Sequence, residues 1–349
     1  MISQAIADAQ KGTIGTDGIV KLLTATGEDR EKLFQAARGA RSRNFGNKVF
    51  TYGFVYFSTH CKNNCSFCYY RRSNTSLERY RKSKEEIVQL AGSLKDAGIN
   101  MADLTMGEDP LMYANGYEKL LDIISSVRDS VGIPIMASPG AMPKDMFPKL
   151  RDAGADWFAC YQETYDRELF SRMRLEQDYS NRMNQKIWSM EAGMLAEDGM
   201  MVGLGETPES RAETILRMGK LGCQQIRAMT FVPQSGTPME TVIPQNSDDE
   251  LNAIAVMRLL FPDRLIPASL DVEGIAGLRT RLDAGANVIT SIVPPDMNLA
   301  GVAQHDLDIN NGNRSVEHVM AMLDDMGYRP GTDAEFREFM NSRRGTWHA

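Results

Sequence analysis

The sequence lacks any long hydrophobic run and any excess of positive charge. No apolar stretch in its 349 residues approaches the roughly 18 residues that cross a bilayer, and segment 1–12 has neither the basic start nor the apolar core of a signal peptide. Lys and Arg number 39 against 46 Asp and Glu, a net charge of -7. Nucleic-acid binders need clustered positive charge, so we expect a cytoplasmic protein whose partners include neither a membrane nor a nucleic acid.

Cysteine is scarce, and its arrangement is unlike a disulfide framework. The chain has five cysteines, an odd number, and three of them, Cys61, Cys65 and Cys68, fall within eight residues. No Pro/Ser-rich linker, low-complexity tract or abrupt change of composition marks a second domain. These absences favour one structural domain in which clustered thiols bind a metal or an iron–sulfur cluster.

What the sequence does contain is a regular alternation of strand and helix patterns. From residue 49 onward, short β-rich apolar runs alternate with segments of helical period, which predicts βαβ units around a parallel sheet. Eight such units close a barrel, so the expected fold class is α/β, a (β/α)8 TIM-type barrel. The predicted strands are Val49–Ser58, Met101–Met106, Ile133–Ser138, Ala155–Tyr161, Met200–Leu204, Gln225–Phe231, Arg264–Leu270 and Ala286–Ile292.

Capping residues mark several of the intervening helices. Ser83 followed by Glu86 predicts a capping box, Thr207 precedes a proline at the first helical position, and Ser315 opens a late helix. Residues 1–48 predict two helices, around 17–25 and 28–41, as an N-terminal extension packed on a barrel of residues 49–349. The charged residues after Tyr328 predict a loose tail.

The three clustered cysteines lie just past the carboxyl end of the first predicted strand, where barrel enzymes place their active sites. Three thiolates on one loop can hold three irons of a [4Fe–4S] cubane and leave the fourth iron open to an external ligand. The alternative is a zinc site, which needs a fourth ligand. That ligand would be His60, adjacent to the loop, or the isolated Cys160 or Cys223.

The CxxxCxxC loop after the first strand resembles the radical S-adenosylmethionine (SAM) superfamily. This resemblance implies that Cys61, Cys65 and Cys68 hold a redox-active [4Fe–4S] cluster, that SAM chelates its open iron, and that an electron releases a 5′-deoxyadenosyl radical. It also places Phe67 near the adenine. The sequence Met106-Gly107-Glu108-Asp109-Pro110 is similar to the Gly-Gly-Glu motif that receives the SAM amino group, with Met106 replacing one glycine.

Further stretches are similar to biotin synthase and the hydrogenase-maturation radical SAM enzymes. By that resemblance Glu163 and Arg182 hold the SAM ribose and carboxylate, and the turn with Gly203 and Gly205 brings backbone close to the adenosyl group. Taken alone, such a Gly-x-Gly turn often marks only a tight strand-to-helix connection. Ser138, at the end of the third predicted strand, is a further polar candidate for the cofactor site.

From Thr51 to Met326 the chain is most similar to the family of methylornithine synthases. This resemblance implies a mutase that rearranges the carbon skeleton of L-lysine to 3-methylornithine, the first step of pyrrolysine biosynthesis. It also implies an external one-electron reductant such as flavodoxin or ferredoxin. Beyond the cluster and SAM, no further catalytic residue is predicted.

An α-amino acid substrate needs a cation for its carboxylate and acceptors for its ammonium group. Arg227 lies within the sixth predicted strand, while Ser269 and Asp271 alternate onto one face at the end of the seventh. We expect Arg227 and Asp271 to form a pair that the substrate completes. The alternative is a permanent salt bridge across the barrel.

Two other functions fit the same residues. The chain could be a radical SAM enzyme acting on another small substrate, as in biotin or hydrogenase-cofactor assembly, although no second cysteine cluster suggests sulfur insertion. From a different class, it could be a non-catalytic iron–sulfur scaffold or electron carrier, whose cluster would not respond to SAM.

Overall fold

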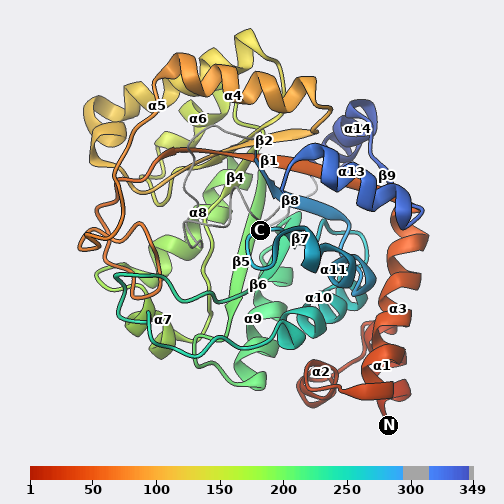
Figure 1. Cartoon of the computed structure of the whole chain (residues 1–349). Coiled ribbons are helices and arrows are strands. Elements are labelled where there is room, and N and C mark those ends of the chain that lie inside the picture. Colours follow the sequence, from red (N-terminus) through yellow and green to blue (C-terminus); the bar gives the residue numbers. More distant parts are fainter. Residues whose placement is uncertain (294–313, 346–349) are drawn as a thin grey trace.

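The chain folds into a parallel barrel surrounded by helices (Figure 1). The structure, a computed structural model, describes residues 1–293 and 314–345. The sequence pattern predicted all eight barrel strands, with boundaries that differ by a few residues. They are β1 (Lys48–Ser58), β2 (Met101–Met106), β3 (Ile135–Ser138), β4 (Trp157–Ala159), β5 (Leu195–Val202), β6 (Gln225–Thr230), β7 (Pro267–Ser269) and β8 (Val288–Ile292).

The sheet runs in the order β6-β5-β4-β3-β2-β1-β8-β7, and its strands pair in parallel. Between β6 and β7 the described contact is an isolated bridge, Gln225 to Leu265, so the barrel is nearly closed. The predicted (β/α)8 TIM-type class is confirmed. All eight carboxyl ends therefore meet at one rim, and side chains from distant parts of the sequence converge there.

The predicted caps are present. Ser83 and Glu86 form a capping box at α4, and the Thr207 and Ser315 hydroxyls accept from backbone N–H groups at α9 and α13. None of the described helices is both long and apolar enough to cross a membrane. The described α-helices after β1 are α4 (Lys84–Asp96), α5 (Pro110–Ser130), α6 (Met146–Ala153), α7 (Arg167–Met173), α8 (Tyr179–Glu191), α9 (Pro208–Lys220), α10 (Asp248–Leu260), α11 (Leu278–Asp283), α13 (Val316–Asp325) and α14 (Asp333–Arg343).

The N-terminal segment holds three helices rather than the two predicted: α1 (Ile2–Lys11), α2 (Thr16–Leu23) and α3 (Gly27–Phe45). The missed helix α1 is short, but it buries Ile2, Ala5, Ile6 and Ala9. Helices α2 and α3 pack on α9 and α10, on the outside of the barrel (Figure 1). The division of the chain into an extension, 1–48, and a barrel, 49–349, stays a prediction.

The expectation of a loose tail after Tyr328 is wrong. Residues 329–330 form a short strand, β9, beside the start of β1, and α14 follows with Phe336 and Met340 buried. Thr332 and Glu335 form a capping box, the same signal that predicted α4. The charged composition concealed one apolar side of this helix, which covers the amino-terminal end of the barrel.

Strand β5 begins five residues before its predicted start at Met200, at Leu195. The residues missed include Glu197 and Asp198, and charged residues are unusual in a strand buried on both faces. Both side chains are fully buried and ion-paired, Glu197 with Arg227 at 3.0 Å and Asp198 with Lys186 at 3.6 Å. Their partners come from other elements, so the strand pattern alone could not reveal them.

Replacing Arg281 with methionine should strongly destabilise the fold. Arg281 on α11 pairs with Glu250 on α10 through two contacts of 2.6 and 3.0 Å, and both side chains are fully buried. Glu250 also accepts from the backbone and hydroxyl of Thr230 at the end of β6. Leaving this carboxylate unpaired should lower the free energy of unfolding by about 3–5 kcal/mol, measured by urea denaturation.

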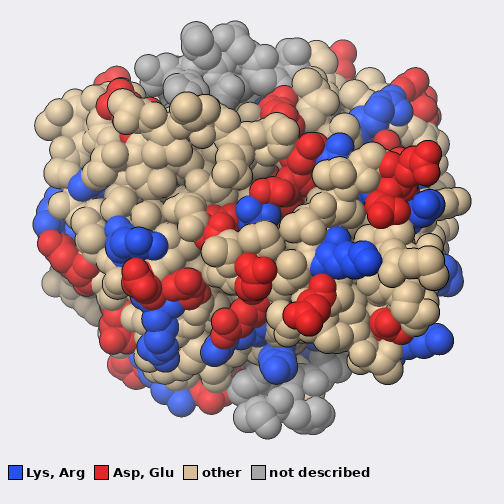
Figure 2. Space-filling view, turned by 90° about the horizontal axis from the view of Figure 1, so that it is seen from below, with Lys and Arg blue, Asp and Glu red and all other residues tan. Residues whose placement is uncertain are grey.

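The matched control is Arg217→Met, which breaks an exposed pair with Glu213. Basic and acidic side chains lie side by side in the lower part and on the right of the face shown in Figure 2, and such exposed pairs contribute about 1 kcal/mol or less. Equal, small losses for the two variants would contradict the structural role assigned to Arg281.

Candidate active site

A cavity opens at the carboxyl ends of the strands, where barrel enzymes place their active sites. It contains about 1110 Å³ of space, including open solvent at its mouth. The sequence-predicted residues in its wall are Cys61, Cys65, Phe67, Cys68, Gly107, Glu108, Ser138, Glu163, Arg182, Arg227 and Asp271. Eleven predicted residues from seven different parts of the chain therefore surround one space.

The cysteine loop leaves β1 and packs against the turn that follows β2. The Lys62 backbone N–H donates to the Glu108 carbonyl at 2.9 Å, and the Gly107 N–H donates to the Ser58 carbonyl at 3.0 Å. A Cβ at Gly107 would lie 2.3 Å from the His60 carbonyl oxygen. Glycine is required here because only a residue without a side chain permits this approach.

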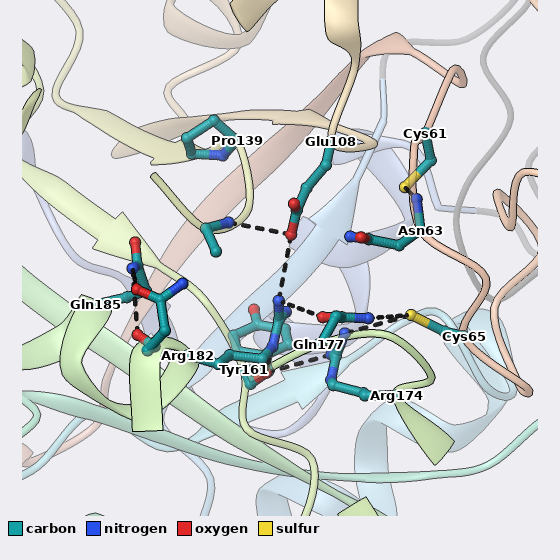
Figure 3. A network of polar contacts seen from close by, with 12 residues as sticks. Cys61, Asn63, Cys65, Glu108, Pro139, Tyr161, Arg174, Gln177, Arg182 and Gln185 are labelled. Carbon is teal, nitrogen blue, oxygen red and sulfur yellow. Dashed lines mark hydrogen bonds and ion pairs between the residues drawn. The ribbon is translucent and has the colours of Figure 1, made fainter. Parts of the chain in front are cut away.

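Glu108 lies buried at the centre of a charged network (Figure 3). Its carboxylate accepts from the Ala141 N–H at 3.1 Å and pairs with Arg182 on α8 at 3.4 Å and with Lys62 at 3.3 Å. Gly140 adopts a φ of +86°, and a Cβ there would lie 2.2 Å from the Glu108 Cγ. The sequence analysis missed Gly140, although a glycine just after a strand end is a signal of close approach.

Glu163 follows β4 in a strained backbone conformation, with a φ of 67°. It bridges to β5, where its N–H donates to the Gly199 carbonyl and its carbonyl accepts from the Met201 N–H. Its carboxylate pairs with the buried guanidinium of Arg174 at 2.6 Å. Positive φ at a non-glycine residue clusters at functional sites, because the surrounding structure must hold it there. Arg174 also lines the cavity and was missed, since no motif accompanies it.

Comparison with known proteins agrees with this geometry. Residues 55–218 match the family model described as the radical SAM superfamily. The chain is 44% identical over 324 residues to 3-methylornithine synthase of Methanosarcina acetivorans, covering 93% of this chain and 92% of that protein. It is 45% identical over 309 residues to the Methanosarcina barkeri protein of the same name, covering 88% of each.

This chain belongs to the methylornithine synthase family of radical SAM proteins. A crystal structure of methylornithine synthase superposes with a TM-score of 0.91 at 42% identity, covering 96% of this chain and 99% of that one. A more distant relative is the [FeFe] hydrogenase maturase subunit HydE of Thermotoga maritima, 29% identical over 309 residues, 87% of this chain and 88% of that protein. The fold inferred from the alternation of strands and helices is thus confirmed, as is the family inferred from the cysteine loop and the further motifs.

For a member of the methylornithine synthase family, the three thiols of the loop fit a cluster. Burial raises the pKa of Cys61 to about 11, and burial followed by the neighbouring thiols raises that of Cys68. Thiolates are therefore stable here only beside positive charge, which iron supplies. Within the described residues, no three His, Cys, Asp or Glu side chains converge on a single ion. A cubane does not need such convergence because each thiolate binds a different iron.

Deeper in the barrel, the pair of Arg227 and Asp271 that the substrate completes stays a prediction. Among the described residues, Arg227 forms no direct ion pair with Asp271, so the alternative, a permanent salt bridge between them, is absent. Arg227 pairs with Glu197 on β5 at 3.0 Å and donates to Thr290 at 3.0 Å and to the Tyr52 hydroxyl. The neighbouring strands β5 and β6 are in register, with Glu197 opposite Gln225, so Arg227 reaches the carboxylate diagonally. Arg227 and Asp271 both line the cavity.

Asp271 pairs instead with the buried Arg314 at 3.0 Å. Its other oxygen accepts from Ser269 at 2.9 Å and from Ser291 at 2.5 Å. Burial alone would raise the pKa of Asp271, but Arg314 and these hydroxyls outweigh it and lower the pKa below its ordinary value. Asp271 is therefore a carboxylate at neutral pH. Ser269 supports it from behind and is not part of the cavity wall.

Asp103 on β2 is a cavity residue that the sequence analysis did not identify. Its Oδ1 accepts from the hydroxyls of Ser138 at 2.7 Å and Thr105 at 2.8 Å, and no cationic side chain among the described residues forms an ion pair with it. Burial, with help from nearby Glu197, raises its pKa to about 7. A buried carboxyl group with no ion-pair partner of its own can bind a cationic group of a ligand.

Gly203 and Gly205 lie outside the cavity wall. Both have positive φ, 97° and 99°, so a tight turn explains the glycines. The Glu206 carboxylate accepts from the N–H groups of Gly203 at 2.9 Å and Leu204 at 2.8 Å. Close approach of this turn to a cofactor stays a prediction.

Proposed function

We propose that the chain is a methylornithine synthase, a radical SAM mutase that converts L-lysine to 3-methylornithine in pyrrolysine biosynthesis. Family membership supports the reaction class, and the charges in and directly behind the wall of the inner cavity support the substrate. The five free cysteines fit a reducing compartment, so the proposal includes the cytoplasm. It also includes an external one-electron reductant such as flavodoxin or ferredoxin.

Cys61, Cys65 and Cys68 would hold the [4Fe–4S] cluster at the cavity mouth. When bound, the cluster and SAM supply a radical that takes a hydrogen atom from the substrate. The protein's contribution is to bind, orient and exclude water. The three thiols are mostly buried, and the aromatic ring of Phe67 lies between them in sequence and in the same wall.

Glu108, Arg182 and Glu163 would bind SAM. Glu108 has a carboxylate oxygen for the SAM ammonium group, and Arg182 is a cation for its carboxylate. Arg182 is held by its bond to the Tyr161 carbonyl at 2.7 Å, independently of Glu108. The ion pair of Glu163 with Arg174 leaves the second oxygen of Glu163 for the ribose. Gly107, Ser138 and Phe67 complete this part of the wall.

The inner cavity carries the charge that lysine requires. Arg227, Asp271 and Asp103 lie in its wall. Behind the wall, Glu197 pairs with Arg227 and Arg314 pairs with Asp271. Two cations therefore accompany three carboxylates when all are ionised. The surplus of one negative charge matches lysine, which has two ammonium groups and one carboxylate. This match is the observation that carries the substrate assignment, because an unbalanced charge in a buried site is costly.

Each charge of lysine then has a partner of opposite sign. Arg227 would bind the carboxylate, since its guanidinium lines the cavity. Asp271, positioned by Ser269, would bind the α-ammonium group. Asp103, which accepts only from hydroxyls, would bind the side-chain ammonium. Lysine would thus be fixed at both ends, and the carbon skeleton between them would face the radical.

The test is to incubate reduced, cluster-reconstituted protein with SAM and L-lysine and to search for an isobaric amino acid by mass spectrometry. We expect a new product with the mass of lysine, formed only when SAM and reductant are both present. L-Norleucine, which lacks the side-chain ammonium, should give none. If the EPR signal of the cluster did not change when SAM was added and no isobaric product formed, the proposal would be overturned. The chain would then be a non-catalytic iron–sulfur scaffold or electron carrier.

A further inference from the structure

The sulfur of Cys65 accepts hydrogen bonds from side chains outside its own loop (Figure 3). The Gln177 Nε2 donates to it at 3.0 Å, and the Arg174 Nη1 lies at 3.6 Å. Both donors belong to the segment between α7 and α8. The sulfur of Cys61, by contrast, accepts from a backbone N–H of its own loop, that of Asn63 at 3.4 Å.

The orientation of the Gln177 amide is fixed by a neighbouring charge. Arg182 donates to its Oε1 at 3.2 Å. A guanidinium has only donors, so it selects the amide oxygen and turns the amide nitrogen towards the sulfur. Arg182 in turn contacts Glu108 at 3.4 Å, which makes a continuous chain from Glu108 to the Cys65 sulfur.

The donor segment is anchored to the cysteine loop. The backbone N–H of Ser66 donates to the Met173 carbonyl at 2.8 Å, and the Ser66 hydroxyl donates to the Arg172 carbonyl at 2.8 Å. The buried ion pair of Arg174 with Glu163 holds the start of the segment, and the bond from Arg182 holds the Gln177 amide. The distance from Gln177 to the sulfur is therefore set by the fold and does not depend on a mobile surface side chain.

We propose that Gln177, oriented by Arg182 and assisted by Arg174, raises the reduction potential of the cluster bound at the cysteine loop. The inference rests on the proposed function, because it requires the cluster. Reduction adds one electron from an external donor and no proton, and part of the added negative charge falls on the sulfur ligands. Hydrogen bonds to a more negative sulfur are stronger, so N–H donors stabilise the reduced state. Gln177 is thus a positioning and tuning residue and not a catalytic one.

The experiment is a redox titration of reconstituted, SAM-free protein, in which EPR follows the reduced cluster. Gln177→Leu removes the donor at similar size, and Gln177→Glu replaces it with a carboxylate that cannot donate. At a fixed potential, the ratio of reduced to oxidised cluster should fall roughly tenfold in Gln177→Leu, equivalent to about 59 mV for a one-electron couple. In Gln177→Glu it should fall at least as far.

Gln185→Leu is the matched control. Gln185 is a buried glutamine on α8 near Gln177, and its amide contacts Met142 and Asn181 and not a cysteine. It should retain the parent midpoint. A parent-like midpoint in both Gln177 variants would overturn the inference and leave the proposed function intact, as would variants that fail to assemble the cluster that the parent holds. A parent protein that assembles no [4Fe–4S] cluster would refute the proposed function itself.

Discussion

Cys68→Ala should leave the protein folded but without a stable cluster and without any turnover of lysine. Two thiolates on the loop cannot hold three irons of a cubane. We expect the iron and sulfide content after anaerobic reconstitution to fall from about four of each per chain to near zero. Product formation should fall below detection, since every later step depends on the cluster. The Cys68 thiol lies in the cavity wall and contributes little to the barrel core, so thermal unfolding should change little.

Cys223→Ala supplies the control for this experiment. Cys223 is fully buried, precedes β6 and lies outside the cavity wall. The same substitution there removes a packed thiol, which should lower stability by about 1 kcal/mol and leave the iron content unchanged. If Cys68→Ala retained a full complement of iron, the ligand set proposed here would be wrong.

Asp103→Asn should lower kcat/KM for lysine by roughly a hundred- to a thousandfold, because losing one charge of a buried pair costs about 2–5 kcal/mol. Cluster content and the effect of SAM on the EPR signal should stay as in the parent, since Asp103 contacts neither the cysteine loop nor Glu108 in the described interactions. Steady-state kinetics with L-lysine measure the loss. Asp122→Asn, an exposed residue on α5 paired with Lys84, should behave as the parent.

The same residue predicts a pH dependence. Burial raises the pKa of Asp103 to about 7 in the substrate-free protein, so kcat/KM for lysine should fall as the pH drops below about 7 and the carboxylate becomes protonated. Asp103→Asn should lose that limb of the profile. A parent profile that stays flat from about pH 8 to 6 would remove Asp103 from the substrate site.

The folding stability should depend on pH in the opposite direction to kcat/KM, because it falls as the pH rises. The folded state binds the Asp103 proton more tightly than the unfolded chain, in which the pKa has its ordinary value of 3.8. The stability that this proton contributes is complete below the unfolded pKa and is lost as the pH rises through about 7. Asp103→Asn should therefore unfold at a higher temperature than the parent at about pH 8. Lower activity together with higher stability would separate a binding role from a structural one.

The features of the fold and site that depend on local sequence patterns were predicted. The spacing of Cys61, Cys65 and Cys68, their place after a strand, and alternating periodicity were sufficient for the barrel and the site at its rim. Partners in space were harder to predict. The direct ion-pair partner of Arg227 is Glu197, which the register of β5 and β6 places beside it and which no sequence motif marks.

Residues outside motifs were missed for a related reason. Asp103 is a single acidic residue in an apolar strand, and only its inward orientation in the folded barrel gives it a role. Arg174 and Gln177 lie between two helices, where polar residues are ordinary. Their significance comes from the contact with Cys65, more than a hundred residues away in sequence, at a separation of 109 and 112 positions.

The amino-terminal end of the barrel is covered by β9 and α14, where the indole of Trp157 donates to the sulfur of Met340 and Phe336 packs edge-on against Phe50. The candidate active site and the layer formed by β9 and α14 thus lie at opposite ends of the same strands. Substitutions that improve the packing of β9 and α14 on the barrel should therefore raise the unfolding temperature. The catalytic rate should stay unchanged, because the active site is at the other end of the barrel. The thermal stability of this radical enzyme could thus be raised without replacing any residue that contacts the substrate.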